Sequence, residues 1–304
     1  MEHVYDMIVI GGGPGGYTAA LYAARAGLDV LVLEKLSAGG QMALTSQIDN
    51  YPGFPDGIDG FQLADNMQQQ AERFGAKTEL AEVLSVELVG APKRIHTTEG
   101  DFSARAVVIA TGADARKLGL PKEWDLTGKG VNYCAHCDGH FYKGKTVAVV
   151  GGGNTAVADA LYLSRLAEKV ILIHRRDTLR ATKVYHNALQ EAGNVEFIWN
   201  STVSRLLHDD RLTGVELTNV QTGEKQEIAC DGLFVSIGRK PNTELFPQLA
   251  VDEGGYIIAD ETTKTSIPGV FAVGDVRTKE LRQIVTAVSD GATAAHYTEM
   301  FLLK

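Results

Sequence analysis

The 304-residue sequence has only three cysteines, no block of like charges and no long apolar run. Three cysteines are too few for the disulfide framework of a small secreted protein. No apolar stretch approaches the roughly 20 residues of a membrane span. The N-terminal residues lack the basic region and the long apolar core of a signal peptide. These absences predict a cytoplasmic protein with no membrane segment.

Charge and length narrow the class of protein further. The formal net charge is −9 at pH 7, and the basic residues are not gathered into a patch, so no nucleic-acid partner is expected. With 44% hydrophobic residues, the chain is long enough for about two domains, each with its own core. The 33 glycines predict many tight turns and close backbone approaches.

The stretch from Cys134 to Asp138 has the residue types of a redox site. Two thiols two residues apart can close a small disulfide ring, and one thiolate of such a pair attacks other disulfides because its pKa is lowered. Asp138 is placed to move the proton that thiol–disulfide exchange gains or loses. Half of a zinc site is the alternative, but a structural zinc needs four ligands, and the remaining cysteine, Cys230, stands alone. We predict a redox pair at Cys134 and Cys137 and a buried structural thiol at Cys230.

A first dinucleotide-binding pattern opens the chain. An apolar run ending at Ile10 leads into glycines at positions 11, 13 and 16, which is the G-x-G-x-x-G register. A helical stripe begins at Tyr17, and the next apolar run, residues 28–33, is closed by Glu34. Strand, turn, helix, strand and acid together are typical of a dinucleotide site. The turn brings backbone N–H groups to a pyrophosphate, and Glu34 would accept hydrogen bonds from ribose hydroxyls.

The same pattern returns in the middle of the chain. Residues 146–150 form an apolar run, residues 151–156 are a glycine turn ending in alanine, and a helix and a strand follow. His174 follows Ala156 by 18 positions, the spacing at which Glu34 follows Gly16. The chain therefore has two predicted dinucleotide sites.

The two patterns differ where a ribose would lie. The second has no acid at the strand end but His174, Arg175 and Arg176, with Arg180 one turn further on. Carboxylates suit a free 2′-hydroxyl, whereas guanidinium groups can hold a 2′-phosphate through paired hydrogen bonds. The second site is therefore predicted to prefer NADP(H). A solvated basic turn is the alternative interpretation.

The remaining segments are assigned more coarsely. Residues 61–74 are predicted to form a helix with Phe61, Leu63, Met67 and Phe74 directed inward. Residues 80–110 are predicted to form a strand meander, and strands are expected at 203–207, 214–217 and 232–237. A strand ending at Gly274-Asp275 precedes a final helix that opens at residues 282–284.

Taken together, these motifs resemble the low-molecular-weight, bacterial-type thioredoxin reductases, which are class II pyridine nucleotide-disulfide oxidoreductases. The resemblance covers nearly the whole chain. The motifs that carry it are the Gly11–Gly16 turn, Gly39-Gly40-Gln41, Asn50-Tyr51-Pro52-Gly53, Ala110-Thr111-Gly112-Ala113, Cys134 to Asp138, the turn at 151–156, His174-Arg175-Arg176 with Arg180, Gly274-Asp275 and Arg282-Gln283.

The resemblance implies an α/β fold with two Rossmann-like, three-layer ββα domains in a homodimeric flavoprotein. Residues 1–116 and 246–304 would form the FAD-binding domain, and residues 117–245 the inserted NADPH-binding domain that carries the disulfide. FAD would be held by Gly11, Gly13, Pro14, Gly15, Gly16, Glu34, Lys35, Gly40, Gln41, Asn50, Thr111, Gly112, Asp275, Arg282, Gln283 and Ile284. NADPH would be held by Gly151, Gly153, Asn154, Thr155, Ala156, His174, Arg175, Arg176 and Arg180.

The resemblance also implies catalytic roles. Cys137 would face the flavin, Cys134 would attack thioredoxin, and Asp138 would be the general acid. Because the disulfide and the nicotinamide belong to one domain and both need the flavin, we expect that domain to pivot. Hinges are expected near residues 113–118 and 243–247.

Some alternatives stay open. His136 and His140 depart from the residues the family often has there; they could raise the thiolate fraction, or they could be tolerated loop variation. A peroxiredoxin-linked or glutaredoxin-like carrier could replace thioredoxin, whereas the arginines argue against ferredoxin as the electron donor. A non-catalytic redox sensor is the alternative outside this class, although two complete cofactor sites exceed what sensing requires.

Overall fold

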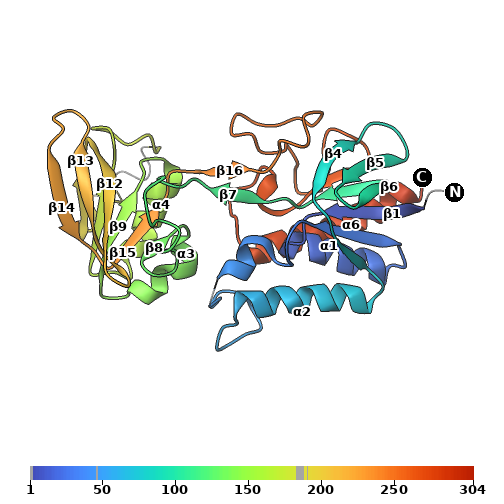
Figure 1. Ribbon diagram of the computed structural model, residues 1–304, viewed down its shortest axis with the longest axis horizontal. Helices are drawn as coiled ribbons and strands as arrows, with labels where there is room; N and C mark the ends of the chain where they lie inside the picture. Colours follow the sequence, from blue (N-terminus) through green and yellow to red (C-terminus); the bar gives the residue numbers. More distant parts are fainter. Residues whose placement is uncertain (1–2, 46, 183–187, 190) are drawn as a thin grey trace. The chain divides into compact units, whose positions relative to one another are not determined.

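The computed structural model describes residues 3–45, 47–182, 188–189 and 191–304. The chain divides into two compact units, shown in Figure 1: Met1–Asp114 with Lys240–Lys304, and Ala115–Arg239. The domain boundaries expected from the sequence, after residues 116 and 245, lie within a few residues of these divisions. The second unit is therefore continuous in sequence, and the first is completed by the last quarter of the chain.

The first unit is built on a seven-stranded sheet in the order β3-β2-β1-β6-β5-β4, with β17 also paired to β6. Strands β1, β2, β3, β6 and β17 are parallel, and β4 and β5 form an antiparallel extension. The bounds are β1 Val4–Ile10, β2 Val30–Glu34, β3 Lys77–Leu80, β4 Val83–Glu87, β5 Lys93–Thr97, β6 Gly100–Ile109 and β17 Val270–Ala272.

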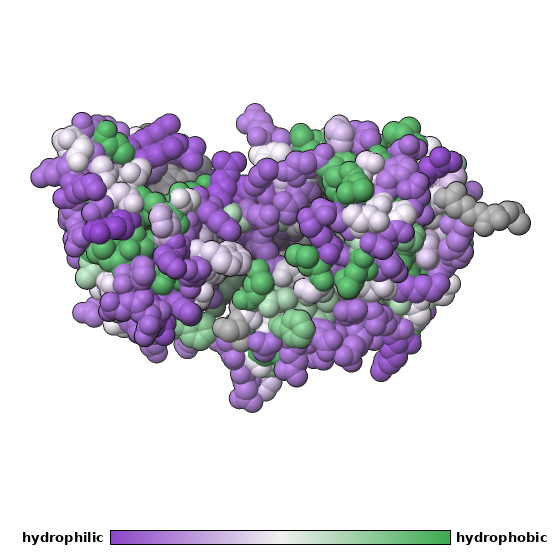
Figure 2. Space-filling view, viewed as in Figure 1, coloured by the Kyte–Doolittle hydropathy of each residue, from purple (hydrophilic) through white to green (hydrophobic). Residues whose placement is uncertain are grey.

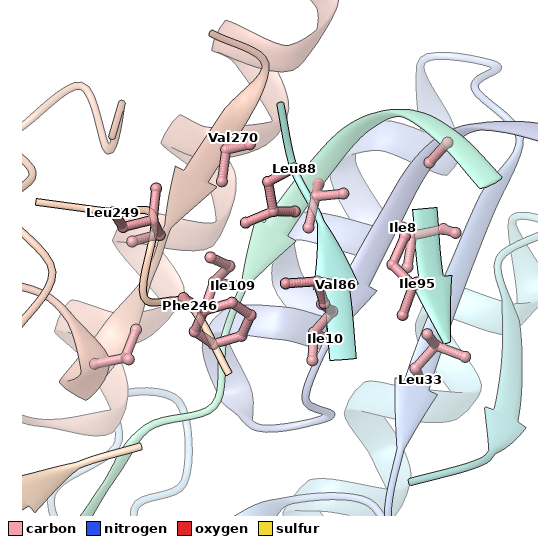
Figure 3. Packing of buried hydrophobic residues seen from close by; sticks show 14 of the residues in the cluster. Ile8, Ile10, Leu33, Val86, Leu88, Ile95, Ile109, Phe246, Leu249 and Val270 are labelled. Atoms are coloured by element: carbon pink, nitrogen blue, oxygen red, sulfur yellow. The ribbon is translucent and has the colours of Figure 1, made fainter. Parts of the chain in front are cut away.

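The central strands are buried on both faces along residues 7–10, 30–33 and 106–109, which is why these stretches are apolar without interruption. Met7 and Val9 point to the helices on one face, and Ile8 and Ile10 point to the opposite face. Figure 3 shows this second face, where Ile8 and Ile10 pack with Val86, Leu88 and Ile95 of the antiparallel extension and with Phe246 and Leu249. The chain after residue 240 thus supplies part of the core formed by the first hundred residues.

Three helices and two short 3-10 turns complete the first unit. Helix α1 starts with Pro14 at its first position, where a missing N–H costs nothing. Helix α2 begins after Asp59, whose side chain accepts a hydrogen bond from Gln62 N at 2.9 Å. The bounds are α1 Pro14–Arg25, η1 Gly40–Leu44, α2 Gly60–Arg73, η3 Gly274–Val276 and α6 Ile284–Leu302.

Helix α2 corrects one prediction. Leu63 is buried, but Phe61 is 60% exposed and Phe74 is 39% exposed, so the inward orientation predicted for these two phenylalanines is wrong. Phe74 lies at the C-cap and its ring is contacted by the guanidinium groups of Arg25 and Arg73, at 5.3 Å and 4.8 Å. Stacking of arginine on an aromatic ring stabilises it without full burial.

The second unit repeats the arrangement with a parallel five-stranded sheet in the order β11-β10-β9-β15-β8. Val147 and Val149 point to helix α4, and Ala148 and Val150 point to an antiparallel sheet, β12-β13-β14. Strand β14 was not predicted, because its residues Lys225–Ala229 are mostly polar. The bounds are β8 Val131–Asn132, α3 Ala135–Asp138, η2 Gly139–Tyr142, β9 Thr146–Val150, α4 Asn154–Ser164, β10 Lys169–Ile173, β11 Val195–Ile198, β12 Ser201–His208, β13 Leu212–Asn219, β14 Lys225–Ala229 and β15 Gly232–Val235.

The chain passes between the units twice, and the two passages pair as short strands. These are β7, Ala113–Ala115, and β16, Arg239–Pro241. Within the described residues, every helix is too short or too polar to cross a membrane. In agreement with this, purple hydrophilic residues predominate on the face shown in Figure 2, and green hydrophobic residues occur in scattered groups. The expected α/β class with two Rossmann-like units is thereby confirmed.

Candidate active site: a sulfur pair and two glycine turns

The sulfur pair lies at the start of the short helix α3. Cys134 is the N-cap residue and forms a disulfide with Cys137, with 5.3 Å between the two Cα atoms. The backbone N–H of Cys137 donates to Cys134 Sγ at 3.2 Å. Both cysteines are half-buried, so a reaction partner can reach them. The same N–H would stabilise a thiolate on Cys134 after reduction.

Asp138 closes the same helix and is also half-buried. Burial raises the pKa of its carboxyl from the usual value of 3.8 to about 6. A carboxylic acid that titrates near pH 6 can hold a proton close to neutral pH and give it to a neighbouring sulfur. The role of Asp138 in proton transfer stays a prediction, and a pKa of about 6 is compatible with it.

Two histidines lie within and just after the sulfur pair in the sequence, and the third cysteine lies elsewhere in the same unit. The exposed His136 stacks on Tyr162 of helix α4, with ring centroids 4.3 Å apart, and the exposed His140 lies in η2. Cys230 is buried, and burial raises the pKa of its thiol to about 12, so it remains protonated. The expectation of a structural thiol agrees with this environment.

The first glycine turn, residues 11–16, follows β1 and opens helix α1. Gly11 has φ +106°, and a Cβ there would lie 2.6 Å from Ala110 O. A Cβ on Gly16 would collide with the carbonyl oxygen of Gly11, whereas one on Gly13 would meet nothing within 4 Å. Gly16 is therefore required by the fold itself, and Gly13 leaves open space beside the helix N-terminus for a ligand.

Glu34 reaches back to this turn from the end of β2. Its Oε2 accepts from Gly12 N at 2.6 Å, and its Oε1 accepts from Lys35 N at 2.9 Å. The carboxylate is thus fixed beside the turn, where a ribose would present its hydroxyls. Lys35 was also predicted to contact FAD. In the structure its side chain forms an exposed ion pair with Glu82 at 2.6 Å.

The other predicted contacts of the first site come together from distant parts of the sequence. Asn50 Nδ2 donates to Gln283 Oε1 at 3.0 Å, and Gln41 Nε2 donates to Ala113 O at 2.7 Å. Thr111 Oγ1 donates to Asn242 O at 2.7 Å, and Asn242 Nδ2 returns a bond to Thr111 O at 3.0 Å. Asn242 was not assigned to the site from the sequence, although it directly follows a Lys-Pro break that marks a turn.

Helix α6 lies directly against the first turn. A Cβ on Gly15 would lie 3.1 Å from Ala287 O, and one on Gly291 would collide with Gly15 O. Arg282, before the helix, is held over the Tyr256 ring at 4.1 Å. Val273, directly before the Gly274–Asp275 turn, also lies against Gly15, so the segment entering that turn and helix α6 both pack on the first glycine turn.

The second glycine turn has the same shape but other neighbours. Gly151 has φ +150° and lies against Ser236 O, and Arg180 N donates to Gly152 O at 2.7 Å. A Cβ on Gly153 would meet only Arg180 Nη2, at 4.0 Å. Ala156 is buried beneath the turn, and Asn154 Oδ1 accepts from Thr182 N at 3.0 Å.

The basic residues of the second site fall into two groups. Arg175, Arg176 and Arg180 are exposed. His174 is only 5% exposed and its ring fills the space where Gly152 would carry a side chain. Burial and then Arg180 lower the pKa of His174, so its imidazole is neutral at pH 7. The exposed arginines are accessible to a phosphate, whereas the buried His174 ring packs against Gly152.

Both turns fit the phosphates of a dinucleotide. In each, the central glycine, Gly13 or Gly153, has open space at the N-terminus of a helix, and this is the arrangement that binds pyrophosphate. Glu34 at the first turn suits a ribose with free hydroxyls, and the arginines at the second turn suit a ribose that carries a 2′-phosphate. Among the described residues, no cluster of three or more His, Cys, Asp and Glu side chains is arranged to hold a metal ion.

Known proteins share this whole arrangement. The family model for pyridine nucleotide-disulphide oxidoreductases matches residues 5–291. A thioredoxin reductase from Streptomyces coelicolor is 47% identical over 306 residues, covering 99% of this chain and 95% of that protein. The bifunctional thioredoxin reductase/thioredoxin of Mycobacterium leprae is 44% identical and covers all of this chain and 67% of that protein.

Solved structures agree with the sequence matches. The crystal structure of thioredoxin reductase from Streptococcus pyogenes has a TM-score of 0.92 and 43% identity, and the alignment covers 100% of this chain and 99% of that one. Matches of this identity over the full length show more than a common fold. The chain belongs to the pyridine nucleotide-disulphide oxidoreductase family.

Proposed function

We propose that this protein is an NADPH-dependent thioredoxin reductase. The observation that carries the proposal is the Cys134–Cys137 disulfide within the unit that also holds the arginine-bearing glycine turn. Relatives named thioredoxin reductase match 99% of the chain or more. FAD belongs on the first turn and NADPH on the second, because the first ends at Glu34 and the second at exposed arginines.

Bound FAD supplies two-electron chemistry between the nicotinamide and the disulfide. The chain's own residues would hold it: the backbone N–H groups of residues 11–16 would bind its phosphates, and Glu34 would accept hydrogen bonds from a ribose. Asn50 and Gln283, which bond to each other at 3.0 Å, form a polar wall contributed by segments more than 230 residues apart. This wall and the Asp275 turn fix the orientation of the cofactor.

Sulfur chemistry follows from the two cysteines and Asp138. The Cys134 thiolate attacks the partner's disulfide, so that a mixed disulfide forms and one partner sulfur leaves as a thiolate. Asp138 protonates that leaving sulfur. The Cys137 thiol then loses its proton and attacks Cys134 Sγ, which restores the internal disulfide and releases the second partner sulfur, and that sulfur takes up the proton. The partner gains two electrons and two protons in total.

The exposed arginines select the phosphorylated nucleotide. Arg175 and Arg176 follow shortly after the end of β10, where the ribose of a bound nucleotide would lie. Arg180 lies beside Gly153. Guanidinium groups bind a phosphate through charge-assisted hydrogen bonds, which are about twice as strong as neutral ones. His174 supports this loop through its contact with Gly152, since its neutral ring carries no charge to offer.

Turnover requires the second unit to pivot relative to the first. The disulfide and the NADPH turn belong to the same unit, and both must reach one flavin. The paired strands β7 and β16, at the divisions after residues 114 and 239, are the proposed hinges, close to the expected ranges 113–118 and 243–247. A cross-link between the units should stop turnover and leave FAD bound; full turnover in the cross-linked protein would contradict the pivot.

Thioredoxin is the proposed partner because one relative carries both names in a single chain, as a bifunctional thioredoxin reductase/thioredoxin. The protein is proposed to be cytoplasmic, where thiol carriers are kept reduced. It is proposed to form a homodimer through the first unit. That unit exposes several large apolar side chains, and Leu36, Phe61 and Leu80 line one pocket of about 370 Å³.

The proposed function is tested by the visible spectrum together with NADPH-dependent reduction of a thioredoxin. A yellow protein that oxidises NADPH steadily when thioredoxin is supplied supports it. Steady oxidation of NADPH with a peroxiredoxin-linked or glutaredoxin-like carrier, but not with thioredoxin, would identify that carrier as the substrate. A protein that cannot be reconstituted with FAD, or whose disulfide stays oxidised under excess NADPH, would contradict the proposal.

A further inference from the structure

A buried cluster of three charged side chains lies behind the Gly274–Val276 turn of the first unit. Arg277 and Asp290 are 2% and 6% exposed, and the Lys279 side chain is 7% exposed. Arg277 holds the Asp290 carboxylate with two bonds, Nε–Oδ2 at 2.9 Å and Nη2–Oδ1 at 2.7 Å. Lys279 Nζ donates to the same Oδ2 at 2.7 Å. Two cations therefore share one carboxylate in what we call the Asp290 cluster.

The Asp290 cluster ties together the segments proposed to hold the flavin. Asp290 Oδ2 also accepts from Gly274 N at 2.8 Å, directly before Asp275. Arg277 Nη1 donates to Thr278 O at 2.9 Å, and Lys279 Nζ donates to Thr286 O in the first turn of α6 at 3.3 Å. The cluster thus joins the Asp275 turn, the loop before α6 and α6 itself.

Arg277, Lys279 and Asp290 together carry two positive charges and one negative charge. Both cations are paired with the same carboxylate, so burial of each is partly offset. Glu261 lies 3.9 Å from Arg277 Nη2 and Asp260 also acts on Arg277, but both carboxylates are exposed, so water screens them. Although burial opposes ionisation of Asp290, its pKa is lowered by its bonds to Arg277 and Lys279, so the carboxylate stays charged. Lys279 is therefore a second cation on a carboxylate that Arg277 already holds with two bonds.

We propose that Asp290 and Lys279 are positioning residues for the flavin. Asp290 fixes the turn and the loop that carry the cofactor contacts. Lys279 adds one positive charge to this region, and a positive charge favours the reduced flavin, because the flavin gains negative charge on reduction. This inference rests on the proposed binding of FAD at the first glycine turn. Its consequence is a reduction potential higher than the same fold would have without Lys279.

The experiment compares Lys279→Met and Lys279→Arg with the control Lys93→Met. Lys93 is also buried, at 2% exposure, with Nζ donating to Leu88 O at 2.9 Å. It lies beside Gly269 and Phe301, at the far end of α6 from Thr286, roughly 22 Å along the helix at 1.5 Å per residue. The flavin potential is measured against a reference dye in FAD-loaded protein carrying Cys134→Ser and Cys137→Ser, so that the disulfide does not contribute.

Lys279→Met should disfavour flavin reduction by roughly three- to tenfold, which is about 15–30 mV more negative for a two-electron couple. Lys279→Arg and Lys93→Met should stay at the parent potential. Equal shifts for Lys279→Met and Lys93→Met, or no shift for Lys279→Met, would overturn the electrostatic role. A parent protein that binds no FAD would instead refute the proposed function.

The positioning role of Asp290 has a separate readout. Asp290→Asn should weaken FAD binding at least tenfold, measured by the recovery of flavin fluorescence on dilution. An unchanged affinity in a folded Asp290→Asn protein would overturn this part. If that variant does not fold, the potentials of the Lys279 variants still decide the electrostatic part.

Discussion

The two glycine turns have the same backbone but different surroundings. At the first turn, a carboxylate from the strand end bonds back to the turn, and α6 closes over it through a contact between Gly291 and Gly15. At the second turn, a neutral, buried histidine fills the corresponding space, and three arginines remain in solvent.

This difference shows how one motif serves two purposes. The first site is assembled from segments far apart in the sequence and closed by a long helix, which suits a cofactor that stays bound. The second is formed by one continuous segment with its charges exposed, which suits a cosubstrate that must enter and leave in each turnover. The sulfur pair belongs only to the second unit, so electrons leave the protein on the same unit through which they enter.

The largest expected effect comes from the sulfur pair. Cys134→Ser or Cys137→Ser should lower thioredoxin reduction by more than about 1,000-fold. The single cysteine that remains cannot form the internal disulfide that passes both electrons to the partner. NADPH should still reduce the flavin, followed as bleaching in the visible spectrum in a stopped-flow instrument. Cys230→Ser is the control and should keep full activity; strong loss in that variant would place the third cysteine in the reaction.

The next largest effect concerns the preference of the second turn for NADPH over NADH. Arg175→Ala and Arg176→Ala should each raise the KM for NADPH by roughly 10- to 150-fold, since a hydrogen bond to a charged group contributes about 1.5–3 kcal/mol. The KM for NADH should change little. Equal losses with both nucleotides would mean that the second turn does not read a 2′-phosphate.

A matched pair of glycine variants tests the assignment of cofactors to turns. Gly13→Ala should weaken FAD binding roughly tenfold and leave the KM for NADPH unchanged, and Gly153→Ala should do the reverse. A Cβ has room at both positions in the free protein, so the loss reports the approach of the ligand and not misfolding. Gly16→Ala, which collides with Gly11 O, should instead destabilise the unit itself.

The last prediction concerns the stability of the fold, Asp138 and pH. Its folded pKa of about 6 lies above the ordinary 3.8, so the folded state holds this proton more tightly than the unfolded state. Ionisation therefore costs stability as pH rises from about 4 through 6, and Asp138→Asn should add about 1–3 kcal/mol at pH 7.5. Urea unfolding should show the gain shrinking toward pH 4.5. The exposed Asp210→Asn is the control, and a gain that does not depend on pH would contradict the account.

The sequence predicted the parts of this molecule that depend on local pattern. The two strand–turn–helix units, the sulfur pair and Asp138 were all recognisable because spacing alone defines them. Phe61 and Phe74 were misplaced because helical periodicity does not reveal which face of α2 lacks a neighbour. Strand β14 was missed because a sheet edge needs no apolar residues.

Contacts between distant segments could not be predicted from local pattern. The bond between Asn50 and Gln283, the pairing of Thr111 with Asn242 and the Asp290 cluster depend on how the chain returns after residue 240. His174 was expected among the NADPH contacts, which stays a prediction; its burial against Gly152 could not be predicted from local pattern.

The return of the chain into the first unit has a consequence for biosynthesis. Strand β17 and helix α6 complete a sheet and a cofactor cradle begun by β1, so the ribosome must synthesise residues 240–304 before that unit can close. The inserted unit, Ala115–Arg239, emerges whole and can fold first. Flavin incorporation should therefore begin only after helix α6 has left the ribosome, and ribosome-bound chains stalled at residue 270 should be colourless.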